Sequence, residues 1–252
     1  MSLTNEFPYP KAEYIDLLTG YYAGINGPES FQPVKDYQSD IMAGHVYCSR
    51  GTVLEKAAFS DLYIQGGTID STPASLSFIE TLAYPSNPKL PGFILMTNMN
   101  EKKGFGRTIV LYTDLIDQNG KLPAADKQIF SETMKSICDK YGYSFEELNA
   151  FGQGQGLLGG IGAECGFVNF FEEKDIPFID EMIRAVLPAY QEILTSRMAE
   201  VPGDEDFEQL YLSRARLVDW IISEDYGVEI GRENGVPMEF VEAYAFPPVI
   251  KY

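Results

Sequence analysis

Apolar and polar residues alternate in short segments between about residue 45 and residue 115. Glycine, proline or asparagine bounds each segment, and the connections are too short to hold the helical crossovers of a parallel sheet. The pattern therefore predicts consecutive strands of an antiparallel meander, at residues 51–55, 60–65, 75–80, 93–97 and 108–112.

A helical period replaces this alternation in the rest of the chain. We expect one helix at residues 11–22, ended by Gly24, and one further strand at residues 165–171. Apolar residues recur at helical spacing in three more segments, which predicts amphipathic helices at residues 124–141, 176–194 and 204–223.

These elements favour an α+β fold, with a large and mostly antiparallel sheet flanked by helices. Because neither a low-complexity linker nor an internal repeat divides the chain, we expect a single domain over residues 1–252. Within it, residues 1–42 form an N-terminal helical segment, residues 43–171 are rich in sheet, and residues 172–252 are helical.

Composition narrows the choice of partners and compartment. The formal charge of −18 disfavours nucleic acid and anionic membranes, because the long-range field repels both. The apolar stretches are of strand length and no signal-peptide pattern opens the chain, so we expect no membrane association. The three cysteines lack paired spacing, which argues against a disulfide framework and favours the cytoplasm.

Candidate cofactor chemistry is sparse. The chain has one histidine, His45, so a multi-histidine metal site is impossible, and we expect His45 to lie at a strand end without chemistry and no metal to be bound. Residues 154–159 read G-Q-G-L-L-G, but they follow a helical segment and precede a strand, the reverse of a dinucleotide site. A glycine loop that admits a flat ligand or another chain remains open.

Several motifs occur in collinear order from residue 51 to residue 252. Residues 51–57 read G-T-V-L-E-K-A, residues 187–190 read L-P-A-Y, and residues 214–220 read R-A-R-L-V-D-W. These segments resemble the oxygen-dependent coproporphyrinogen III oxidase family, whose corresponding motifs are G-x-V-F-E-K-A, L-P-A-Y and R-G-R-Y-V-E-F. The turn at residues 84–91 and the closing F-P-P-V-I-K-Y of residues 246–252 add to this resemblance.

The resemblance implies where a substrate would bind. Asp114 falls at the family's D-L-T-P-Y-Y motif, which makes it the candidate catalytic carboxylate, facing pyrrole N–H groups. Ile94 stands where the family strand T-V-H-x-N-x-R has its histidine, so the family's acid is replaced. The positions that correspond to the family's other substrate contacts are Met96, Asn98, Arg214, Arg216, Gly235 and Val236.

The resemblance also implies a function. It implies a tetrapyrrole-acting oxidoreductase of haem biosynthesis that oxidatively decarboxylates porphyrinogen propionates, with dioxygen as co-substrate, no obligatory organic cofactor, and a homodimeric state. The apolar run at residues 243–250 is the expected dimer contact. Because the family's arginines are largely replaced, we expect weak binding of a substrate rich in carboxylates, and an altered activity.

Two alternatives stay open at this point. One is an enzyme that resembles ferredoxin-dependent bilin reductases, for which Lys102, Lys103 and Arg107 would have to form a basic patch for acidic ferredoxin. The other is a non-catalytic tetrapyrrole-binding protein.

Overall fold

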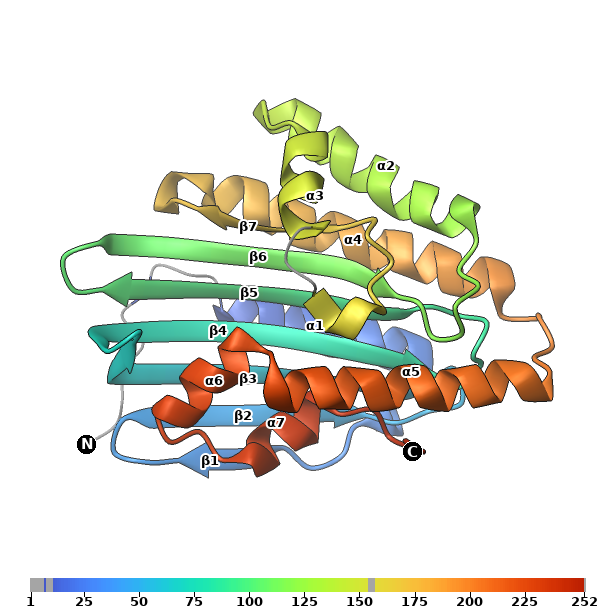
Figure 1. The fold of residues 1–252 in the computed structure, drawn as a ribbon, viewed down its shortest axis with the longest axis horizontal. Helices are drawn as coiled ribbons and strands as arrows, with labels where there is room; N and C mark the ends of the chain where they lie inside the picture. The colour runs from blue at the N-terminus through green and yellow to red at the C-terminus, as the bar shows by residue number, and fades with distance from the viewer. Residues whose placement is uncertain (1–6, 8–10, 154–156, 252) are drawn as a thin grey trace.

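A computed structural model of the chain describes residues 7, 11–153 and 157–251. Its centre is one seven-stranded sheet in which each strand pairs antiparallel with the next along the chain (Figure 1). This confirms the predicted α+β class and the antiparallel meander. The strands are β1 (Lys35–Gln38), β2 (Met42–Ser49), β3 (Leu54–Ile69), β4 (Thr72–Pro85), β5 (Gly92–Lys102), β6 (Gly106–Ile116) and β7 (Phe167–Phe171).

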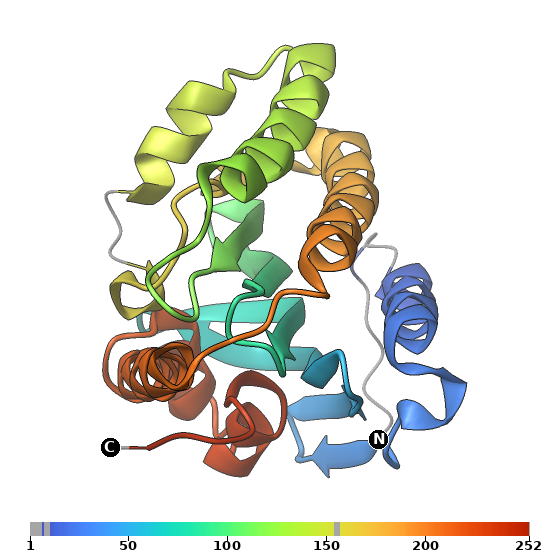
Figure 2. The same ribbon diagram turned by 90° about the vertical axis from the view of Figure 1, so that its right-hand side faces the viewer.

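Three helices cover one face of the sheet, as the view along the layers shows (Figure 2). They are α1 (Lys11–Asn26), α2 (Ala124–Tyr141) and α4 (Ile176–Arg197), while the short α3 (Phe145–Gln153) packs beside the edge strand β7. Phe93 of β5 stacks on Tyr190 of α4 with ring centroids 4.8 Å apart, and it meets Phe130 of α2 edge-on. All three rings are fully buried, so this face is a closed aromatic and aliphatic core.

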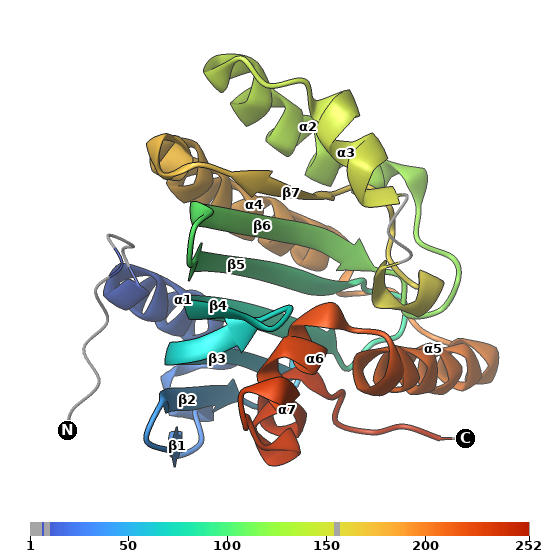
Figure 3. The ribbon, with the colours of Figure 1, turned by 60° about the vertical axis from the view of Figure 1, so that its left-hand side comes forward.

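The C-terminal helices lie on the opposite face (Figure 3). Helices α5 (Asp204–Ser223), α6 (Tyr226–Glu233) and α7 (Met238–Ala245) lie over the part of the sheet that contains β2, β3 and β4. On this face, β5 and β6 are left largely uncovered by helices. Short 3-10 turns occur at Pro28–Ser30, Leu157–Gly160 and Glu173–Asp175. None of the described helices is both long and apolar enough to cross a membrane.

Two predicted elements differ from the structure for tertiary reasons. The strand expected at residues 51–55 begins only at Leu54, and it continues without a break through the strand expected at residues 60–65 as one long strand, β3, because β2 and β4 pair with it on both sides past the polar Ser60 and Asp61. Helix α1 runs past Gly24 to Asn26, whose side chain bonds the backbone N–H and carbonyl of Leu54.

The apolar run at residues 243–250 packs largely against the rest of the same chain. Tyr244 and Ala245 are buried against the sheet, and the Tyr84 hydroxyl donates to the Ala245 carbonyl. Within the run, Val249 is the only large hydrophobic side chain that is strongly exposed, at 41%. The homodimer therefore stays a prediction that rests on the family resemblance rather than on an exposed C-terminal patch.

Candidate functional site

Three side chains form a row across the sheet on the face of the C-terminal helices. In the strand register, Glu80 of β4 is opposite Met96 of β5, and Met96 is opposite Tyr112 of β6. Side chains directly opposite one another on neighbouring strands lie about 5 Å apart at Cβ. Glu80 is in phase with Phe78 and Leu82, so β4 presents a carboxyl group among apolar neighbours.

Two residues of the C-terminal helices approach Glu80. Tyr244 of α7 forms a side-chain hydrogen bond with Glu80, and Asp225 caps the N-terminus of α6 with its side chain, which accepts from the Val228 N–H at 3.0 Å. Burial and the repulsion from Asp225 raise the pKa of Glu80 to about 8, although the Tyr244 hydrogen bond opposes the shift. Glu80 therefore holds a proton at neutral pH.

The neighbouring groups are also tuned toward their neutral forms. Burial raises the pKa of Asp225, against hydrogen bonds from the backbone N–H groups of Val228 and Gly227. Burial and the nearby carboxylates raise the pKa values of Tyr112 and Tyr244 well above the ordinary phenol value. Both phenols consequently remain hydrogen-bond donors throughout the physiological range. We call Glu80, Met96, Tyr112, Asp225 and Tyr244 the Glu80 site.

Beside this site β5 is half-buried, whereas the β6 side chains that share its face, Val110, Tyr112 and Asp114, are buried. Met96 and Asn98 of β5 are half-buried, and the Asn98 amide donates to the Met96 sulfur at 3.6 Å. Phe170 of β7 is 60% exposed. Other half-buried apolar side chains pack at its margin: Leu76, Phe78 and Val168. The structure thus brings two of the predicted substrate contacts, Met96 and Asn98, to the same face as Glu80.

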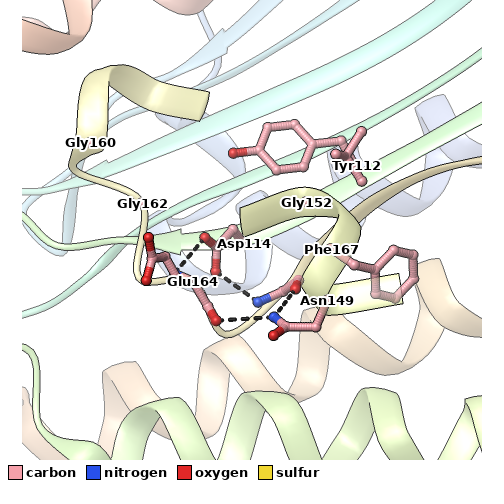
Figure 4. Close-up of a pocket in the computed structure, with 10 residues that line it drawn as sticks. Tyr112, Asp114, Asn149, Gly152, Gly160, Gly162, Glu164 and Phe167 are labelled. Carbon is pink, nitrogen blue, oxygen red and sulfur yellow. Dashed lines mark hydrogen bonds between the residues drawn. The ribbon is translucent and has the colours of Figure 1, made fainter. Parts of the chain in front are cut away.

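Asp114, the candidate catalytic carboxylate, is bound to the chain's own loop (Figure 4). Its Oδ1 accepts from the backbone N–H groups of Leu115 at 2.9 Å, Cys165 at 3.2 Å and Gly166 at 3.0 Å. Its Oδ2 accepts from the N–H of Glu164 at 2.9 Å, and the Cys165 thiol donates to Oδ1 at 3.3 Å. Burial raises the pKa of Asp114, whereas these hydrogen bonds favour the carboxylate. In this structure Asp114 anchors the loop at residues 164–166, and its catalytic role stays a prediction.

The loop that Asp114 holds closes a narrow pocket next to Tyr112. Gly166 passes so close to β6 that an added Cβ would lie 1.8 Å from the Thr113 carbonyl oxygen, so only glycine fits there. The Asn149 amide of α3 donates to the carbonyls of Glu164 and Gly166 at 3.0 and 2.6 Å. Of the glycine motif, Gly154 and Gly156 lie outside the described residues.

The other four predicted substrate contacts lie in α5 or in the turn that follows α6. Arg214 is buried and donates to Glu55 at 2.9 Å and to the Pro85 carbonyl at 3.2 Å, which ties α5 to the sheet. Arg216 is exposed on α5. Gly235 takes a positive φ of 77° in the turn after α6, and Val236 packs against Gly231. The structure does not bring these four beside Glu80, and a substrate-binding role for them stays a prediction.

The possible ferredoxin patch at the β5–β6 hairpin is largely neutralised. Lys102 pairs with Asp70 at 2.8 Å, and Arg107 pairs with Glu101 and Glu173 at 3.0 and 3.2 Å. His45 lies in the middle of β2 rather than at the expected strand end, and its Nδ1 meets Asp36 Oδ1 at 2.7 Å.

Sequence reasoning missed the acid at the centre of this site, although a signal was present. Glu80 is the one acidic position in the β4 phase of Leu76, Phe78, Leu82 and Tyr84. Asp225 and Tyr244 carry no such signal, because only the packing of α6 and α7 brings them to β4. Chemically, the Glu80 site can supply a proton to, and accept hydrogen bonds from, a flat ligand laid on the apolar strands. No family model matches this chain.

Proposed function

We propose that this chain binds a tetrapyrrole against the uncovered strands β5 and β6 and reduces it, with Glu80 as proton donor. The observation that carries the proposal is a carboxyl group whose pKa is raised to about 8, on a sheet face lined mainly by apolar side chains. A buried carboxyl with a raised pKa, next to a second carboxyl, is the usual arrangement of a general acid.

The surface suits a flat, conjugated ligand rich in N–H groups. Half-buried Phe78 and Met96 offer apolar contact to the ring faces, and burying them further is worth about 25 cal/mol per Å². Pyrrole N–H groups need acceptors in such a site, and the oxygens of Glu80, Asp225 and Asn98 can serve.

The reaction that fits this proton supply is reduction of an open-chain tetrapyrrole, as in the bilin reductase alternative. Adding two electrons to one double bond also consumes two protons. Glu80 gives the first, and solvent returns the proton to its carboxylate before the second transfer. The electrons come from a one-electron donor of the ferredoxin class.

The oxidase activity implied by the family resemblance is less well supported by this site. Oxidative decarboxylation requires that several propionates be held, normally by arginine forks. Arg214 is committed to Glu55 and to the backbone, and the residues of the Glu80 site are neutral or acidic. We therefore rank a bilin-type substrate above coproporphyrinogen.

Anaerobic titration with biliverdin and with a porphyrin, followed by addition of reduced ferredoxin, tests the proposal. Wild-type protein should bind biliverdin, with a shifted absorption band, and convert it to a reduced product. Glu80→Gln should keep the binding but lose turnover by about 10²–10⁴-fold, the usual worth of a general acid. Glu192→Gln, an exposed change on α4, is the matched control and should behave as wild type.

The contrary outcomes separate the alternatives. Absence of tetrapyrrole binding overturns the proposal as a whole. Binding without turnover identifies a carrier, and aerobic turnover of coproporphyrinogen identifies an oxidase.

A further inference from the structure

A second cavity shares no lining residue with the Glu80 site. Strands β1 and β2, the start of β3, and α7 with the closing segment surround it. The chemistry-bearing residues of its wall are Lys35, Cys48, Arg50, Lys56, Glu239 and Glu242.

Lys56 is the innermost of these residues. It is 3% exposed, and its ammonium donates to the backbone carbonyls of Glu242 at 3.3 Å and of Phe246 at 2.5 Å. Among the described residues, no carboxylate lies within ion-pair distance of its Nζ. Two N–H bonds to two carbonyls satisfy an uncharged amine, so the third position of the nitrogen is left for whatever enters the cavity.

The charges around Lys56 favour an anion. Burial, Arg50 and Lys35 lower the pKa of Lys56 to about 7, and Cys48 opposes them. The side chains of Arg50 and Lys35 are exposed at the cavity rim, and neither forms an ion pair with any described residue. Glu239 and Glu242 line the α7 wall but are not among the charges that shift this pKa, and the Tyr37 hydroxyl is directed to the Glu239 carbonyl at 3.1 Å.

We propose that Lys56, Arg50 and Lys35 form a binding site for a small oxyanion, a carboxylate or a phosphate. Protonation of Lys56 creates the third N–H, which the anion accepts, while Arg50 and Lys35 close over it from the rim. Binding therefore takes up a proton when the free protein holds Lys56 as a neutral amine. In a chain of net charge −18, these three basic side chains form no ion pair with a described carboxylate, so they can attract an anion although Glu239 and Glu242 line the opposite wall.

Calorimetric titration with sulfate tests the site, because sulfate itself does not titrate near neutral pH. Wild-type protein should bind sulfate saturably, and the affinity should fall by up to about tenfold per pH unit above pH 7 as Lys56 loses its proton. Parallel titrations with acetate and with inorganic phosphate show which oxyanion chemistry the site prefers. Arg50→Gln should weaken sulfate binding by about ten- to a hundredfold, the worth of one charge-assisted contact.

Lys127→Met is the matched control, since Lys127 also donates to a backbone carbonyl, that of Ala163, but lies outside this cavity. Lys56→Met should abolish the pH dependence, and Arg50→Gln decides alone if Lys56→Met does not fold. Unsaturable sulfate binding overturns the proposal, as does equal affinity in Arg50→Gln and wild type.

Discussion

The two faces of the sheet differ in how completely they are closed. The face beneath α1, α2 and α4 buries an almost wholly apolar set, in which Phe93, Phe130 and Tyr190 have no exposure. The face beneath α5, α6 and α7 buries Lys56 and Arg214, holds the half-buried Glu80, and leaves part of β5 half-exposed. The closed face stabilises the fold, whereas the half-covered face retains the polar groups that a ligand could use.

This difference has an energetic cost on the second face. Removing a charge from water is unfavourable unless it is paired, and such groups shift their pKa toward the neutral form instead. Glu80 and Lys56 show this in opposite directions, since the pKa of the acid is raised and that of the amine is lowered. A protein that needed only stability would place apolar side chains at both positions.

Truncating one aromatic side chain on each face tests how differently the two faces are packed. Phe93→Ala opens a cavity in the closed core and should lower the free energy of unfolding by about 3–5 kcal/mol. Phe78→Ala removes a half-buried ring from the open face, where solvent already reaches it, and should cost clearly less. Urea denaturation of both variants measures the difference, and equal losses would show that the two faces are equally closed.

Glu80 should make the free energy of unfolding depend on pH. In the unfolded chain Glu80 ionises with a pKa of 4.5, but in the folded chain only near 8, so the native state binds the extra proton between these values. Stability from this group is therefore fully present below pH 4.5 and is lost as the pH rises to about 8. Glu80→Gln should unfold with a weaker pH dependence, and its stability relative to the wild type should rise as the pH increases from 4.5 to about 8.

Thermal or urea unfolding from pH 4.5 to pH 8.5 checks this prediction. The exposed Glu192→Gln variant should follow the wild-type curve throughout. An unchanged slope in Glu80→Gln would show that Glu80 ionises normally in the folded protein.

The smallest expected effect concerns Asp114. Asp114→Asn replaces one of the two carboxylate oxygens by an NH2 group, which cannot accept from a loop N–H, and should destabilise the fold by about 1–3 kcal/mol. If Asp114 only anchors the loop, tetrapyrrole affinity per folded molecule should stay unchanged. A selective loss of affinity, measured by absorbance titration, would instead restore the predicted contact with pyrrole N–H groups.

Local periodicity was enough for the long amphipathic helices. The predicted helices at residues 124–141 and 204–223 coincide with α2 and α5, because each helix buries one apolar stripe against its neighbours. The class of sheet also followed from the chain, since connections of a few residues permit only antiparallel neighbours. Strand limits were less predictable, and β3 continues through polar residues because both of its neighbours hold it.

For the Glu80 site, the sequence alone shows which single residues can do chemistry, but not which of them come together. The phase of β4 already places the Glu80 carboxyl among apolar positions of that strand, and the sequence already limits histidine-based proton chemistry to the single His45. Tertiary structure decides that Asp225 and Tyr244, which lie more than 140 residues further along the chain, meet Glu80. The physical reason is that a pKa depends on desolvation and on nearby charges, and both arise only when α6 and α7 pack on the sheet.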